Sequence, residues 1–293
     1  MKTRFFVLAA LALAAAACDN NIERPDYDGR VAARFTADIT PATRVSGTAW
    51  DEGDRIGISG AAYTNVPFIL KEGRFCEDGL TIYYEDSETQ TFNAYYPYDE
   101  AGGLLTATTD ATAQQNQTAI DYLFAAGATG SYISPVVKFT DKTAEGGEDN
   151  SFHHCMSRIT LTFKAGDGVY FNQIKPESYT LDGVKLTGTF DTATGTAAAG
   201  DEAQAGTLTM ELADGSLSSS VILFPQAAAS LSLVVRFNNQ EYKATLTLPD
   251  GALKAGNNYT YTVTVRNQKI EVGDAEIASW IDVPTSDGVN ATL

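Results

Sequence analysis

Alternation of apolar and polar residues with a period of two is the feature that most constrains this fold. In residues 259–265, tyrosine and valine fill one set of alternate positions and threonine fills the other. Three further runs repeat the pattern: 159–163, 207–212 and 231–237. This period is typical of half-buried antiparallel strands, and pairs such as Asp182-Gly183 and Asp250-Gly251 favour tight turns between them. The chain is therefore predicted to be all-β and built from β-sandwiches.

The first half shows the same pattern less regularly. Six strands are expected there: Val31 to Ile39, Arg55 to Ile58, Phe68 to Leu70, Leu80 to Tyr84, Thr91 to Tyr96, and Val136 to Phe139. Residues 114–126 fit either a short helix or a loop. The Ala/Thr/Gly-rich region 191–206 is predicted to be a long hairpin loop.

A polar stretch suggests a division into two domains. Residues 141–150 contain no hydrophobic residue except Ala144, which is typical of a linker or an exposed loop. We therefore predict an N-terminal domain over 31–150 and a C-terminal domain over 151–293, in line with the length of the chain.

The first seventeen residues have the composition of a cleavable export signal. A short positive region precedes an apolar run that is too short to span a bilayer. The run ends at Ala15-Ala16-Ala17, directly before Cys18, and this stretch resembles the lipobox of bacterial lipoproteins. We expect residues 1–17 to be the signal peptide, Cys18 to be lipidated, and 18–30 to form a polar tether. The alternative is an ordinary secretory signal cut near Ala17.

Composition excludes several classes of function. The formal net charge of −17 disfavours a general nucleic-acid binder, because phosphate backbones repel an acidic chain. Two His and three Cys cannot build a zinc-rich framework or a dense set of disulfides. No nucleophile elbow, phosphate-binding loop, zinc-protease motif or dinucleotide fingerprint occurs in the sequence. We therefore predict no enzyme activity, no catalytic residue, no metal and no cofactor.

Two local clusters of potential metal ligands have simpler interpretations. Neighbouring strand residues point to opposite faces, so His153-His154-Cys155 fits an ordinary strand better than a metal site. Asp51-Glu52-Gly53-Asp54 lacks the downstream ligands of an EF-hand and is predicted to be an exposed turn. Cys76 and Cys155 are expected to be free thiols, with a disulfide across the domain boundary as the alternative.

Aromatic residues gather at Tyr95-Tyr96-Pro97-Tyr98. Exposed tyrosines can stack on sugars, but aromatic residues in strands more often fill a core. We expect core packing for this run. Tyr98 is the expected exception, as a ligand-binding residue, because Pro97 turns the chain before it.

A series of short motifs extends along nearly the whole chain. They are Thr43-Arg44-Val45, Trp50, Gly53-Asp54-Arg55-Ile56-Gly57-Ile58, Tyr95-Tyr96-Pro97, Asp121-Tyr122-Leu123-Phe124-Ala125, Phe152-His153-His154-Cys155-Met156-Ser157-Arg158-Ile159, Phe224-Pro225-Gln226, Leu253-Lys254-Ala255-Gly256-Asn257-Asn258-Tyr259-Thr260-Tyr261 and Ile277-Ala278-Ser279-Trp280. Together they resemble the fimbrillin family of Bacteroidales surface lipoproteins. The resemblance implies two β-sandwich domains of transthyretin-like Greek-key topology, assembled into pili or related surface structures.

The resemblance also implies a route of assembly. A protease cuts after an arginine, the first strand leaves, and a strand of another subunit fills the groove by β-augmentation. Here the displaced strand would present five residues at alternate positions: Val31, Ala33, Phe35, Ala37 and Ile39. Arg44 is the expected cleavage site, because Arg34 lies inside the strand and a cut at Arg30 would leave the strand attached. The alternative is that this chain is not processed.

The expected role is a cell-surface pilus subunit or adhesin of the fimbrium, held at the outer membrane by its N-terminal lipid. Its partners would be other pilus subunits and a host glycoprotein or glycan. Residues 281–293 include Pro284, which suits a donor strand poorly, so a tip, anchor or accessory subunit is expected rather than a stalk subunit. The alternative is a surface lipoprotein that binds carbohydrate or a host ligand and never polymerises.

Overall fold

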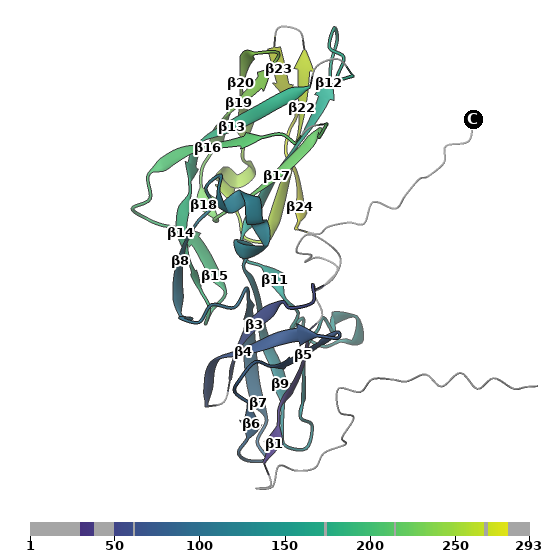
Figure 1. The fold of residues 1–293 in the computed structure, drawn as a ribbon, viewed down its shortest axis with the longest axis vertical. Coiled ribbons are helices and arrows are strands. Elements are labelled where there is room, and N and C mark those ends of the chain that lie inside the picture. Colours follow the sequence, from purple (N-terminus) through teal and green to yellow (C-terminus); the bar gives the residue numbers. More distant parts are fainter. Residues whose placement is uncertain are drawn as a thin grey trace, which may run out of the picture.

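The chain forms two β-rich bodies stacked along one long axis (Figure 1). This computed structural model describes the following residues: 30–37, 50–60, 62–172, 175–213, 215–266 and 269–280. Within these ranges the helical structure is limited to three short 3₁₀ helices, and none of them is long or apolar enough to cross a bilayer. The predicted all-β class is confirmed.

The lower body in Figure 1 is one eight-stranded sheet in the order β10-β2-β5-β4-β3-β7-β9-β11. Its strands are β2 (Arg34–Ala37), β3 (Arg55–Gly60), β4 (Tyr63–Lys71), β5 (Arg74–Glu77), β7 (Gln90–Tyr96), β9 (Leu123–Gly130), β10 (Val136–Phe139) and β11 (His153–His154). All neighbours are antiparallel except β10 and β2, and the sheet curves so that β10 also lies beside β9. A short pair, β1 (Val31–Ala32) with β6 (Tyr83–Tyr84), continues the first strand.

Strand alternation builds the core of this body. In β4, Val66, Phe68 and Leu70 are buried and the residues between them are not, as a pleated strand with one covered face requires. β5 was absent from the expected strands, and the strand expected over Leu80 to Tyr84 is reduced to β6. Leu80 itself lies outside any strand and is 55% exposed.

The upper body packs a five-stranded sheet on a four-stranded sheet. The first sheet contains β12 (Ser157–Ala165), β17 (Ser218–Leu223), β22 (Asn257–Arg266), β23 (Lys269–Val272) and β24 (Glu276–Ser279). The second contains β13 (Pro176–Lys185), β16 (Ala205–Glu211), β19 (Ser230–Phe237) and β20 (Gln240–Thr247). Tyr259, Tyr261, Val263 and Val265 of β22 are all buried between the sheets, as their alternation predicts.

A three-stranded sheet joins the two halves of the sequence. It has the order β15-β14-β8, from β8 (Leu104–Thr108), β14 (Thr187–Asp191) and β15 (Thr196–Ala199). β8 therefore leaves the first half of the chain to pair with the second half. The hairpin loop predicted over 191–206 is wrong, because β15 and the start of β16 lie inside it. Small Ala, Gly and Thr side chains gave no alternation from which to detect a strand there.

The short elements complete the fold. They are the 3₁₀ helices η1 (Ala113–Ala119), η2 (Thr143–Glu145) and η3 (Pro249–Gly251), and the pair β18 (Gln226–Ala227) with β21 (Ala252–Leu253). Residues 114–126 thus contain most of η1 followed by the start of β9. β8 and η1 belong to the first half of the chain but pack against the second half. The division into domains over 31–150 and 151–293 stays a prediction.

Glutamine side chains of η1 cover the outer edge of β17. Gln114 is buried, and its Nε2 donates to the carbonyl oxygens of Ile222 (2.7 Å) and Thr109 (2.9 Å). Its Oε1 accepts a hydrogen bond from the Ile222 backbone N–H at 3.0 Å. Gln117 Nε2 donates to the Ser220 carbonyl at 2.7 Å. These amides take the place of a neighbouring strand.

Replacing Gln114 with leucine is expected to lower the free energy of unfolding by about 2–4 kcal/mol, because it leaves buried backbone groups of Ile222 unpaired. Urea denaturation followed by fluorescence measures the change. Gln115→Leu on the exposed side of η1 is the matched control and should change stability little. Equal losses in the two variants would contradict the assignment.

Candidate functional site: the first strand and its groove

The first strand lies inside the lower sheet rather than at its edge. β2 has β10 on one side and β5 on the other. The parallel pairing with β10 extends over the whole strand, from Arg34 opposite Val136 to Ala37 opposite Phe139. The antiparallel pairing with β5 is limited to Phe35 opposite Phe75. The strand is thus attached firmly on one side and at a single position on the other.

The side chains of this strand alternate between core and solvent. Ala33 and Phe35 are 1% and 2% exposed, whereas Arg34 and Thr36 face outward. The Phe35 ring lies edge-on to Phe68 and Phe92, with centroid distances of 4.8 and 5.3 Å. The Phe35 ring is therefore the part of the strand that inserts furthest into the core.

Further hydrogen bonds hold the two ends of the strand. The Ala33 N–H donates to the Ile82 carbonyl at 2.8 Å, and the Arg34 N–H donates to the Pro135 carbonyl at 3.0 Å. At the other end, Trp50 Nε1 donates to the Ala37 carbonyl at 3.2 Å. This hydrogen bond joins Trp50 to Ala37, the last described residue of the strand.

Further aromatic rings pack against Phe35 and around Trp50. Phe139 is stacked at 6.3 Å from Phe35, and Trp50 lies edge-on to Phe75, Phe152 and Tyr96 at 5.1–5.4 Å. If β2 left, the facing edges of β5 and β10 would lose their backbone partners. The rings beneath Phe35 would then form the floor of an apolar groove.

The structure describes only some of the residues predicted for this site. Ala33 and Phe35 are buried and Val31 and Ala37 are half-buried, and their role as a displaced strand stays a prediction. Three predicted residues lie outside the described ranges: Cys18, Ile39 and Arg44. In the sequence, Arg44 falls between Ala37 and Trp50, the two residues joined by the indole hydrogen bond.

The tyrosine run packs largely as core. Tyr95 and Tyr96 are 2% and 6% exposed, which confirms their predicted burial, and desolvation raises the pKa of Tyr95 to about 12. Tyr98 is half-buried, with the Arg55 guanidinium 4.7 Å from its ring centroid. One face of the ring is therefore occupied, so the structure adds no support to Tyr98 as a sugar-stacking residue.

The other clusters also follow strand geometry. His153 is exposed and His154 is buried, as expected of neighbours in a strand. Cys76 and Cys155 are both free thiols, as predicted. Asp54 Oδ2 accepts a hydrogen bond from the Asp51 N–H at 2.8 Å, which closes the predicted turn. Among the described residues, no three His, Cys, Asp or Glu side chains are grouped to hold a metal ion.

A polar cluster at the junction of the two bodies was not predicted. His154 Nδ1 lies 2.7 Å from Asp121 Oδ1, and both side chains are buried. Trp280 stacks on the His154 ring, with centroids 4.0 Å apart and planes 4° apart, and the Arg158 guanidinium lies 5.0 Å from the indole. Burial and the nearby Asp121 carboxylate raise the pKa of the Cys155 thiol, which keeps it protonated. The cluster ties the last described residue to both bodies.

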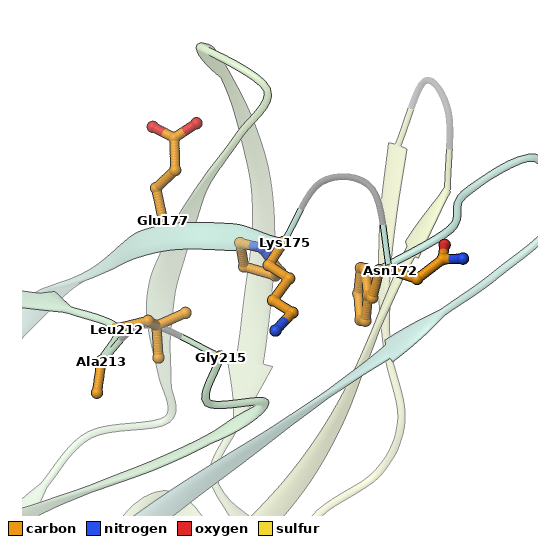
Figure 2. A pocket seen from close by; sticks show the side chains of 8 residues that line it. Asn172, Lys175, Glu177, Leu212, Ala213 and Gly215 are labelled. Atoms are coloured by element: carbon orange, nitrogen blue, oxygen red, sulfur yellow. The ribbon is translucent and has the colours of Figure 1, made fainter.

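An open pocket of about 490 Å³ lies on the upper body (Figure 2). Its lining residues are Phe171, Asn172, Lys175, Pro176, Glu177, Leu212, Ala213 and Gly215. The Glu177 carboxylate points away from Lys175 in Figure 2 and instead binds Arg236 Nε at 3.0 Å. Among the described lining residues, no nucleophile is paired with a base.

The fold is all-β, with stacked sheets and an enclosed first strand. A family model described as fimbrillin-like matches residues 43–280, and the chain belongs to this family. It is 26% identical to "Putative fimbrium subunit Fim1C" of Bacteroides uniformis, over 94% of this chain and 93% of that protein.

Two solved structures share the fold. A crystal structure of a "putative cell adhesion protein" from Bacteroides ovatus has a TM-score of 0.68 and 29% identity, covering 86% of this chain and 97% of that one. A second, from Bacteroides uniformis and described in the same words, has a TM-score of 0.67 and 24% identity, covering 86% of this chain and 100% of that one.

Proposed function

We propose that this chain is a cell-surface fimbrial subunit or adhesin that assembles by strand addition. The observation that carries the proposal is the enclosed position of β2, whose Phe35 fills an aromatic core while a single pairing joins the strand to β5. The names of the relatives, a fimbrium subunit and a cell adhesion protein, support the same role.

Departure of β2 would create a specific acceptor for another strand. The edges of β5 and β10 would carry unpaired N–H and C=O groups on either side of an apolar floor. An incoming strand with apolar side chains at alternate positions would restore both the hydrogen bonds and the core. Burial of one phenylalanine side chain contributes about 1.5–3 kcal/mol, so the second strand must supply an equivalent residue at this position.

Cleavage after Arg44 would make that departure possible. A cut there separates β2 from β3 in the chain, so the first strand is then retained only by non-covalent contacts. Arg34 is a poorer site, because its own N–H is bonded to Pro135 within the strand. Arg30 precedes the strand, and a cut after it would leave β2 joined to the rest.

We propose a tip, anchor or accessory role, because Pro284 within residues 281–293 suits a donor strand poorly. β24 pairs with β22 of the same chain, from Thr260 opposite Glu276 to Asn257 opposite Ser279. Trp280 directly after it is 2% exposed. A strand engaged in this way is not free to be donated to another subunit. The proposed location is the outer membrane, where the lipid on Cys18 anchors the precursor until cleavage after Arg44 separates it from the rest of the chain.

Arg44→Ala tests the processing step. In wild-type cells we expect surface-extracted protein to begin at Val45, whereas the variant should keep the N-terminus at Cys18 and the larger mass. Arg74→Ala, which alters another exposed arginine, should be processed like wild type. N-terminal sequencing and intact mass provide the measurement. The same N-terminus in wild type and in Arg44→Ala would refute cleavage at Arg44.

A further inference from the structure

The open pocket of the upper body combines apolar walls with one basic side chain (Figure 2). Its carbon surface comes mainly from Phe171, Pro176 and Leu212, and its positive charge comes from Lys175. The volume of about 490 Å³ is within the range of sites that hold small ligands. Residues 173, 174 and 214 are next to lining residues in the sequence but lie outside the described ranges, so they are not counted in this site.

The Lys175 ammonium group points into the pocket. In Figure 2 the side chain runs from the start of β13 toward Gly215, on the opposite side of the ribbon from the Glu177 carboxylate. A Cβ atom added at Gly215 would lie 3.3 Å from Lys175 Nζ, so the ammonium group is close to the facing turn. The absence of a side chain at Gly215 leaves space for a ligand beside the charge.

No residue that the structure describes neutralises this charge. Glu177 is the acidic residue of the lining, but its carboxylate binds Arg236 Nε at 3.0 Å and accepts a hydrogen bond from the Asn239 N–H at 3.2 Å. Lys175 is half-buried and, within the described ranges, makes neither a hydrogen bond nor an ion pair through its ammonium group.

The other half-buried basic side chains of the described ranges have partners. Lys185 donates to two backbone carbonyls, and Arg266 binds two carboxylates. The Arg158 guanidinium lies over the Trp280 indole. A charge that is partly removed from water and has no partner is unfavourable. An anion bound in the pocket would supply the partner that Lys175 lacks.

We infer that this pocket binds a single carboxylate attached to a ring-sized body with an apolar face. The lysine ammonium group is a compact point charge, and its hydrogen bond to a carboxylate is of the strong, charge-assisted kind. The apolar face of the ligand would pack on Phe171 and Leu212. Ligands with several negative charges are disfavoured, because the described lining offers one cation on a chain with a net charge of −17. Free aromatic acids and acidic sugars at the ends of glycans share this chemistry.

The pocket lies at the end of the upper body that is remote from the junction. β12 begins directly after Met156, which belongs to a buried cluster with residues of both bodies. The nine residues of the strand extend about 30 Å before the chain reaches Phe171. Figure 1 shows β1, where the first strand begins, at the opposite end of the lower body. In a lipid-anchored precursor the pocket would therefore be remote from the anchor. This placement rests on the proposed function, whereas the ligand chemistry does not.

Removal of the ammonium group tests the site. Ligand-observed NMR of the full chain in mild detergent should show binding of phenylacetate or glucuronate, but not of the neutral counterparts phenylacetamide and glucose. Lys175→Met should raise the dissociation constant of the acid about tenfold or more, because a hydrogen bond between charged groups is lost. Lys243→Met, at an exposed lysine of β20, makes the same change in net charge and should bind like wild type. Thermal melting confirms that both variants fold.

A second pair of variants tests the apolar wall. Phe171→Ala should also weaken binding, whereas Tyr170→Ala, at a neighbouring side chain that is 66% exposed, should not. Binding of either acid supports the site, and the acid that binds more tightly identifies the source of the ligand. Equal binding of the acids and their neutral counterparts, equal losses in the two lysine variants, or no binding of either acid would overturn the proposal. These outcomes leave assembly by strand addition unaffected, because Arg44→Ala tests that proposal separately.

Discussion

Phe35→Ala is expected to lower the free energy of unfolding by about 3–5 kcal/mol, the usual range for loss of a fully buried phenylalanine. The ring is 2% exposed and contacts three other phenylalanine rings: Phe68, Phe92 and Phe139. Its removal leaves a cavity between β10 and β5 and weakens the strand where only one pairing joins it to β5. Urea denaturation measures the loss of stability, and limited proteolysis of the folded chain should show earlier release of the N-terminal segment.

Thr36→Ala is the matched control for this experiment. Thr36 lies in the same strand and pairs with Lys138, but its side chain is exposed. Its replacement should change the stability by about 0.5 kcal/mol or less, as is usual at the surface. Comparable losses in the two variants would show that the strand is held by its backbone alone, contrary to the role assigned to the Phe35 ring.

Trp280→Ala is expected to have a similarly large effect, about 3–5 kcal/mol, although the residue lies at the end of the described chain. The indole covers the His154 ring, and its backbone N–H donates to the Gly256 carbonyl. Its loss would let water reach the buried Asp121 and His154 pair at the junction of the two bodies. Chemical denaturation measures the change, and proteolysis should reveal cuts near β11 and β24.

A control for this variant lies three residues earlier. Ile277 is in β24 opposite Tyr259 but is 44% exposed, so Ile277→Ala tests the strand without the buried anchor. We expect it to cost at most about 1 kcal/mol. A result in which Trp280→Ala is as mild as Ile277→Ala would show that the junction does not depend on the indole.

The sequence predicts those strands that show a clear alternation of apolar and polar residues within the strand itself. β12 and β22 alternate large apolar residues with threonine, and both strands occur where this period indicates them. β15 was missed because its Thr-Ala-Ala-Ala sequence offers no contrast between its two faces. β8, with two adjacent leucines before its threonines, also lacks a clear alternation.

Some features of the candidate site follow from the local sequence, and others depend on contacts between residues far apart in the chain. Burial of Ala33 and Phe35 follows from their alternate positions in a predicted strand. The position of that strand between β5 and β10 does not, because β10 begins about a hundred residues further along the chain and pairs in parallel. The stacking of Trp280 on His154 is equally non-local. Sequence motifs marked both residues, but only the folded chain brings them together.

The packing of β8 and η1 against the second half of the chain also affects the order in which the chain can fold. Thr108 pairs with Thr187, and Gln117 bonds to Ser220, so neither segment finds its partners until most of the chain is available to fold. Domains usually fold in turn during synthesis, the N-terminal one first. Here the first half cannot complete its fold until β14 is available to pair with β8. Contacts between segments so distant in sequence form slowly. We therefore expect β8 to stay unpaired until residues 187–191 become available.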